Sequence, residues 1–321
     1  MKTEKILFIT NIEHLQISQD LERGEKVGDR FRLTNNSSVI HGLITPVFRF
    51  SAGGLEASYL EKTGAIAYAV EEHQPLADDD AAQAFLLRRL AEVHIFFHML
   101  WLVKDNSVNV ELGYLQHPYA TSPRSRVSRI SFARANSTAL GEVVPTHFSR
   151  EELREARKAF GFLSPDDIIL RPQSATLETS RLERAFYFLQ AARGASDLGV
   201  KISNYCTCFE ALFSTDAQEL AHKLAERIAC FLEPELANRL ELYRAVKKAY
   251  GIRSKVVHGV AGSPRLRETL KNTASVCDEV ARKVLVRILS DSTHRKQFMT
   301  EGGEDRMEEY LLSLVLGPPI K

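Results

Sequence analysis

A short segment of the sequence, YGIRSKVVHG at residues 250–259, joins a permanent cation to a titratable imidazole. Arg253 can hold a phosphate group through paired N–H donors of its guanidinium. His258, with an ordinary pKa of about 6.5, can move a proton at neutral pH. These groups suit RNA cleavage without a metal ion, in which the ribose 2′-hydroxyl attacks the adjacent phosphorus and leaves a 2′,3′-cyclic phosphate.

An arginine and a histidine at this spacing also occur often by chance, and a lone histidine more often satisfies a hydrogen bond in a core. On an ideal α-helix, five positions turn by roughly 140° and rise by about 7.5 Å, which separates Arg253 from His258. A two-fold dimer would bring two copies of the segment around one phosphate. The spacing therefore predicts a homodimer if the site is catalytic.

Other residues have candidate supporting roles. Glu210 occurs in an apolar segment, where a carboxylate needs a partner. It either orients Arg253 or forms a structural ion pair, with Arg227 as one candidate partner. Ser254 can bond near the scissile group or bond backbone, and Lys255 adds a nearby cation. Lys223 and Arg227, one helical turn apart, either hold RNA or cover the exterior of the helices, and we favour the exterior.

A second basic region lies between Leu112 and Gly141, where the sequence has no acidic residue. Its arginines and nearby aromatic residues suit a groove for single-stranded RNA, because arginine neutralises phosphates and aromatic rings stack on bases. A solvated strand and loop is the simpler interpretation. The residues concerned are Arg124, Arg126, Arg129 and Arg134, with Tyr114, Tyr119 and Phe132.

No pattern in the sequence predicts a cofactor or a metal. The four cysteines lack the spacing of a zinc site, and we expect reduced thiols in the core. His94 and His98 are four residues apart, but no third ligand is indicated. Composition is that of an ordinary globular protein, with 44% hydrophobic residues and a formal charge of +1. Without a signal-like or membrane-spanning apolar run, we expect a cytoplasmic protein that does not contact membranes.

The first 145 residues predict an α+β domain with a sensing or regulatory role. One helix is expected from Asp78 to Val103, where three aspartates precede an apolar run. Runs of β-branched and aromatic residues between turn residues predict the strands. These expected strands are 5–10, 26–33, 39–50, 65–70, 108–115 and 127–133.

Residues 146–321 predict an all-helical domain. Ser149 with Glu152, and Ser180 with Glu183, have the spacing of capping boxes that begin helices. A period near 3.6 residues then continues between short breaks. The expected helices are 181–195, 201–213, 216–232, 234–258, 264–290 and 304–316, with a polar tail after Ser290.

Three ordered blocks of this second half closely resemble the ApeA-like branch of the HEPN domains. They are 209–214 (FEALFS), 219–232 (ELAHKLAERIACFL), and Tyr250 with 253–259 (RSKVVHG). The resemblance covers roughly residues 180–290 and implies a helical bundle that dimerises. In many HEPN ribonucleases a motif of the type Arg-x4-His cuts RNA, and it corresponds here to Arg253 and His258.

The resemblance implies an endoribonuclease of bacterial anti-phage defence, acting on RNA such as tRNA or single-stranded RNA. Because some HEPN members lack catalysis, the alternative is a dimerisation module that binds a nucleotide, RNA or a protein. A third hypothesis places RNA binding in the arginine-rich segment, with the helical half providing only dimerisation.

Overall fold

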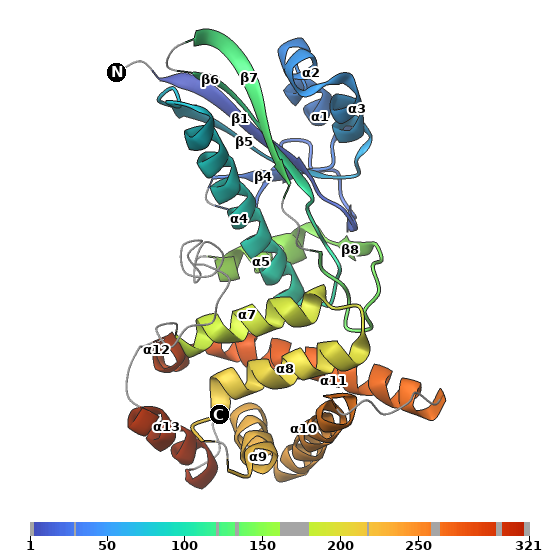
Figure 1. Cartoon of the computed structure of the whole chain (residues 1–321), viewed down its shortest axis with the longest axis vertical. Coiled ribbons are helices and arrows are strands. Elements are labelled where there is room, and N and C mark those ends of the chain that lie inside the picture. Colours follow the sequence, from blue (N-terminus) through green and yellow to red (C-terminus); the bar gives the residue numbers. More distant parts are fainter. Residues whose placement is uncertain are drawn as a thin grey trace. The chain divides into compact units, whose positions relative to one another are not determined.

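The computed structural model describes residues 3–28, 30–119, 122–131, 135–160, 180–216, 218–257, 264–299 and 304–317. The chain forms two compact units, which Figure 1 shows. Unit 1 comprises residues 1–136 with 143–170, and unit 2 comprises 137–142 with 171–321. The α+β class expected from the sequence is what the structure has, with an antiparallel sheet followed by helices.

Unit 1 is built on a six-stranded antiparallel sheet in the order β3-β4-β5-β1-β6-β7. The central strand β1 is an apolar run that is buried on both faces, because helices cover both sides of the sheet. A separate parallel pair joins β2 to β8. The strands are β1 (Glu4–Asn11), β2 (Leu15–Ile17), β3 (Glu25–Lys26), β4 (Arg32–Thr34), β5 (Ile66–His73), β6 (Leu112–Tyr119), β7 (Ser122–Ser131) and β8 (Thr146–Phe148).

Helix α4 (Asp79–Val103) packs on one face of this sheet, as expected from its sequence. The side chain of Asp78 accepts a hydrogen bond from the amide of Ala81 and so caps the helix. Helix α5 (Arg150–Phe160) packs against α4 and begins with the expected capping box of Ser149 and Glu152. This packing places α5 in unit 1, beyond the expected boundary at residue 145.

Residues 39–43 and 46–50 are helical, so the prediction of a strand over 39–50 was wrong. Helices α1 (Ser37–Leu43), α2 (Pro46–Ala52) and α3 (Gly54–Lys62) cover the other face of the sheet. Asn36 and Thr45 cap the first two through their side chains. Ile40 in α1, Ile44 at the C-cap of α1 and Phe48 in α2 are buried and pack into one core. The two side-chain caps and this burial outweigh the strand preference of the β-branched residues.

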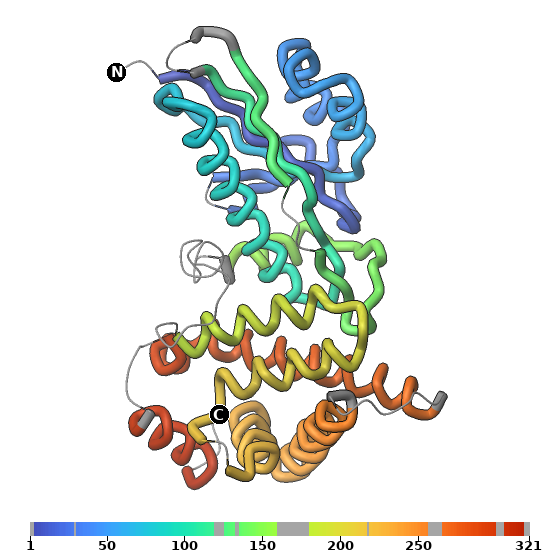
Figure 2. The backbone as a smooth tube through the Cα atoms, viewed as in Figure 1, coloured from blue at the N-terminus to red at the C-terminus, as the bar shows by residue number. Residues whose placement is uncertain are grey.

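Unit 2 is a bundle in which α8 packs against four other helices, α7, α9, α10 and α11 (Figure 2). Helix α7 begins with the expected capping box of Ser180 and Glu183. The helices are α7 (Arg181–Gly194), α8 (Leu198–Phe213), α9 (Leu220–Leu232), α10 (Leu236–Val257), α11 (Pro264–Ser290), α12 (Ser292–Met299) and α13 (Glu304–Leu316). The bounds of α11 and α13 match the prediction, whereas α12 lies where we expected only a polar tail.

The segment 137–142 belongs to unit 2 because it bonds to the end of α7. The amide and the hydroxyl of Ser137 donate to the carbonyl of Arg193, both at 2.7 Å. Buried Lys201 donates to the hydroxyl of Ser137 and to the carbonyl of Ala192. Across the described ranges, every helix is too short or too polar to cross a lipid bilayer.

Candidate functional site

The candidate site is built on the contact between α8 and α10 in unit 2. Arg253 projects from α10, and its Nη1 forms an ion pair with the Glu210 carboxylate on α8. The two side chains are 31% and 20% exposed, so the pair lies at the rim of the bundle and not in its sealed interior. A solute can therefore reach the guanidinium while the carboxylate fixes its direction.

Tyr250 supports Arg253 from one helical turn earlier on α10. The guanidinium carbon lies 5.8 Å from the centroid of the Tyr250 ring, within the range of a cation–π contact. The Tyr250 hydroxyl donates to the carbonyl of Cys206 at 2.8 Å. Burial raises the pKa of Tyr250, which keeps this hydroxyl a protonated donor. Sequence analysis assigned Tyr250 no role. The signal that could have identified it is the position of an aromatic residue three residues before Arg253.

Glu210 leaves part of the guanidinium available for a second anion. A guanidinium has five N–H donors in one plane, and Glu210 engages the Nη1 end. Because the Arg253 side chain as a whole is 31% exposed, its remaining N–H donors are candidates for binding a phosphate oxygen. Of the two interpretations of Glu210, the structure has the contact with Arg253, and not the one with Arg227.

His258 lies outside the described residues, as does the rest of the connection from α10 to α11. Ser254 and Lys255 follow Arg253 on α10, and both are exposed. The structure therefore describes Arg253 of the predicted pair and not His258, and the roles of both side chains in RNA cleavage stay predictions.

Lys223 and Arg227 on α9 are engaged within the bundle. The ammonium of Lys223 contacts both carboxylate oxygens of Asp216, at 3.0 and 2.9 Å. Arg227 is buried, and its Nη1 donates at 2.6 Å to the carbonyl of Phe213, the last residue of α8. The preference for an exterior position was therefore wrong for Arg227, which satisfies the end of a helix adjoining the site.

The arginines of β7 do not share one surface. Side chains alternate between the faces of a strand, so Arg126 and Arg129 point to opposite sides of the sheet. Arg129 forms an ion pair with Glu56 at 2.7 Å. Tyr114 is buried with its ring 5.9 Å from that of Phe48, so it cannot stack on a base. The structure does not describe the side chains of the other residues of this predicted region, which are Tyr119, Arg124, Phe132 and Arg134.

Among the described residues, no group of three or more His, Cys, Asp or Glu side chains is placed so that it could bind a metal ion. Cys206, Cys208 and Cys277 are buried free thiols. Burial raises the pKa of Cys206 and of Cys208 to about 12, so both stay protonated and unreactive. His94 and His98 are buried in α4, as expected for core residues.

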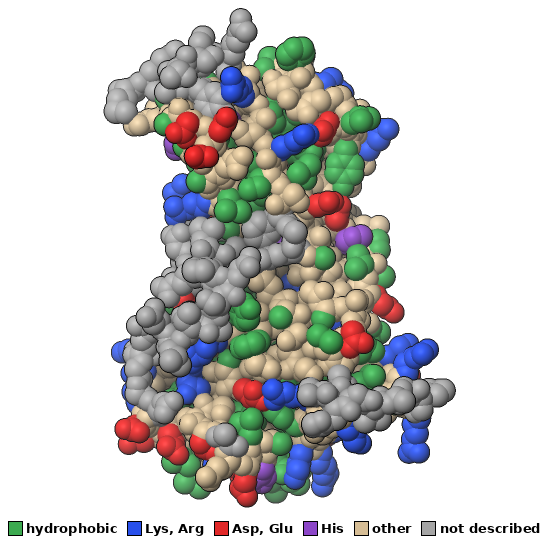
Figure 3. Space-filling view, in the orientation of Figure 1, with side chains coloured by type: hydrophobic (Ala, Val, Ile, Leu, Met, Phe, Trp, Pro, Cys, Tyr) green, Lys and Arg blue, Asp and Glu red, His purple; other side chains and the backbone are tan. Residues whose placement is uncertain are grey.

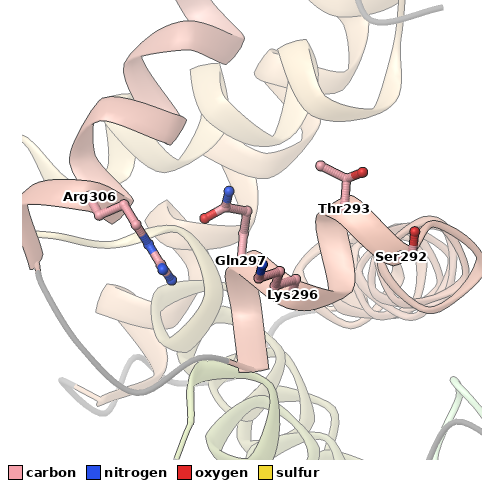
Figure 4. Close-up of a pocket in the computed structure, with 5 residues that line it drawn as sticks. All are labelled: Ser292, Thr293, Lys296, Gln297 and Arg306. Carbon is pink, nitrogen blue, oxygen red and sulfur yellow. The ribbon is translucent and has the colours of Figure 1, made fainter.

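A separate pocket of about 500 Å³ lies between α12 and α13 (Figure 4). Arg306 points from α13 toward Lys296 and Gln297 of α12, while Ser292 and Thr293 line the other end. None of these residues belongs to the α8–α10 contact, so this pocket is not part of the candidate site.

Comparisons of the chain with known protein families, with curated proteins and with solved structures give no match. The candidate site therefore depends on its own residues and geometry.

Proposed function

We propose that the protein is a metal-independent RNA endonuclease of the HEPN type that acts in bacterial anti-phage defence. The observation that supports this proposal is the pair of Arg253 and Glu210 at the rim of the bundle. It provides an oriented, solvent-accessible guanidinium on the helix that leads to His258. The family itself is supported by the three sequence blocks described above.

In the proposed reaction, one His258 acts as base and takes the proton of a ribose 2′-hydroxyl. The 2′-oxygen attacks the adjacent phosphorus, and the bond from phosphorus to the 5′-oxygen breaks. The departing oxygen receives a proton from the second His258 or from water. Arg253 stabilises the charge on the phosphoryl oxygens during this step. The products are a 2′,3′-cyclic phosphate and a new 5′-hydroxyl.

We place this site at a homodimer interface. A helical path from Arg253 to His258 would direct their side chains about 140° apart. The guanidinium that binds the phosphate, which we call the Arg253 clamp, would then be separated from the imidazole of the same chain. Two copies related by a two-fold axis present two guanidinium groups and two imidazoles to one phosphate. Replacing Arg253 in one subunit of such a dimer would then impair a pocket that both subunits share.

The direct experiment incubates the purified protein with total RNA and with tRNA in EDTA, and then determines the ends of the fragments. We expect cleavage that leaves 2′,3′-cyclic phosphate ends. Intact RNA, or 5′-phosphate ends produced only with a divalent metal, would contradict the proposed mechanism.

One observation favours the alternative of a non-catalytic HEPN dimerisation module. The charge of Arg253 is already balanced by Glu210, which is also what a purely structural ion pair requires. That alternative predicts that neither the wild-type protein nor His258→Ala cleaves RNA, while both remain dimers of the same size in solution.

A further inference from the structure

Helix α10 carries a stripe of exposed cations, formed by Arg244, Lys247, Lys248 and Lys255. Their spacing of i, i+3, i+4 and i+11 keeps them within roughly 100° on one side of the helix. Gly251 lies between them, and an added Cβ there would meet open space. We call these four residues the α10 stripe.

Helix stability does not explain this stripe. Cations four residues apart on one helix face repel each other, as Arg244 and Lys248 do here. No Asp or Glu occurs anywhere from residue 242 to residue 267, although the whole chain has a net charge of only +1. Glu241, three residues before Arg244, is the carboxylate nearest to the stripe in the sequence, and the positive charge from Arg244 onward is concentrated without a further acid.

A second group of exposed cations lies at the start of α11. Arg265, Arg267 and Lys271 are exposed there, with Glu268 as the one acidic residue among them. Figure 3 shows Lys and Arg side chains gathered at the lower right of the view, on the part of unit 2 that α10 and α11 form. Such a surface attracts a polyanion, because binding releases the counterions of the phosphates.

We propose that the α10 stripe binds the backbone of single-stranded RNA. The choice of RNA rests on the proposed function, and a neighbouring aromatic pair supports it. Tyr243 borders the stripe, its hydroxyl accepts from Lys247 at 3.2 Å, and its ring lies 5.6 Å from that of His222. Basic grooves with aromatic rings at their edge are typical of single-strand binding.

An anionic membrane fits the stripe less well. A helix that lies on a membrane needs large apolar side chains beside its cations. The described side chains from 241 to 255 include no large exposed hydrophobic residue. Leu236 and Leu240 are exposed on the same side of α10, two turns and one turn before Arg244, so the large apolar side chains precede the cations and do not lie beside them.

The stripe is independent of the Arg253 clamp. Arg253 is turned by roughly 140–180° from Arg244 and Lys248 around the helix axis, on the side that faces α8. Replacing the stripe therefore leaves the contact between Arg253 and Glu210 in place. Binding by the stripe and cleavage by the clamp can be measured separately.

The test measures fluorescence anisotropy of a 2′-O-methylated RNA oligonucleotide, which cannot undergo attack by its own 2′-oxygen. For the wild type, neutralising about four phosphates predicts a slope near −3 in a plot of log K against log salt concentration. In Lys247→Glu/Lys248→Glu we expect at least tenfold weaker binding at 0.1 M salt. The slope should become shallower by about 1.4.

Arg157→Glu/Lys158→Glu is the matched control, because it reverses two adjacent exposed cations on α5 and changes the net charge equally. We expect this control to bind RNA within about twofold of the wild type. Lys247→Gln/Lys248→Gln, which removes charge without reversing it, should weaken binding by a smaller factor. Circular dichroism of each variant verifies that the helices are intact.

Equal RNA binding by the stripe variant and the control would overturn the proposal. So would binding of phosphatidylserine vesicles, but not RNA, by the wild type. If the stripe variant loses RNA binding while the wild type cleaves no RNA, the result supports RNA binding by the stripe and contradicts the nuclease proposal. If the wild type cleaves RNA and the stripe variant binds it normally, the result supports the nuclease proposal and contradicts RNA binding by the stripe.

Discussion

Each unit contains an arginine paired with glutamate beside an aromatic ring, but the two sites differ in solvent access. In unit 1, Arg89 on α4 contacts Glu92 at 2.7 and 2.9 Å and Glu71 at 2.9 Å, and its guanidinium lies 4.8 Å from the Phe85 ring. Its side chain is only 2% exposed. Arg253 has one carboxylate partner and is 31% exposed.

This difference separates a structural ion pair from a candidate binding group. Two carboxylates bind the Nη1 and Nη2 atoms of Arg89, and the side chain is buried, so no external anion can reach it. Arg253 has one carboxylate partner, which engages its Nη1, and its side chain is partly exposed. The comparison shows that residue type and pairing alone do not identify a site, and that the unsatisfied, accessible part of the cation is what matters.

The largest expected effect on stability is at the buried cluster. Arg89→Ala leaves Glu71 and Glu92 without their cation, and breaking a buried pair in this way costs about 3–5 kcal/mol. Urea unfolding would measure the loss. Arg89→Met is the control that keeps the length of the side chain without its charge, and it should be nearly as destabilising. A loss below about 1 kcal/mol would show that the cluster does not stabilise unit 1.

At Arg253 we expect a large effect on the cleavage rate and a small effect on stability. Arg253→Ala should lower the rate of RNA cleavage by about 10²–10³-fold, because it removes donors that stabilise the transition state. Its unfolding free energy should change by only about 1 kcal/mol, since the ion pair is partly solvated. Arg253→Lys should recover part of the rate. A variant that loses several kcal/mol of stability, but cleaves RNA at the wild-type rate under conditions in which it is folded, would make Arg253 structural, like Arg89.

A smaller effect is expected from the residue that positions Arg253. Glu210→Gln keeps the shape of the side chain and removes its charge, so the guanidinium loses its fixed direction. We expect about a tenfold slower rate, and little further loss when Arg253→Ala is added. Fully additive losses would indicate that Glu210 acts independently of Arg253.

The smallest effect concerns pH. Burial raises the pKa of Glu92 above its ordinary 4.5, and the charge of Arg89 opposes that rise only in part. The folded state then binds more protons than the unfolded state, so this group's contribution to stability falls as pH rises above 4.5. Relative to wild type, Glu92→Gln should become more stable between pH 4 and pH 6. A difference that is constant with pH would contradict this prediction.

Local signals in the sequence were sufficient for much of unit 2. Capping residues such as Ser180 and Glu183, together with the helical period, predicted the bounds of α7, α11 and α13 to within one residue, whereas α8 begins three residues earlier and α9 four residues later than predicted. The same kind of signal predicted α4. In α1 and α2 the β-branched residues suggested a strand, while the helix signals were the capping residues Asn36 and Thr45 and the proline that begins α2.

The site itself could be predicted only in part. Glu210 and Arg253 are 43 positions apart, and their contact was one of two alternatives that the sequence left open. Whether a cation lies at a rim or in a core depends on how whole helices pack, as the contrast between Arg253 and buried Arg227 shows. Neither residue type nor spacing contains that information.

The most direct test of the central claim compares RNA cleavage by wild type and His258→Ala in EDTA, with melting temperature and dimer mass measured on the same samples. We predict a rate at least about 10²-fold lower for the variant, with unchanged stability and mass. Cleavage by His258→Ala as fast as by wild type would contradict the account.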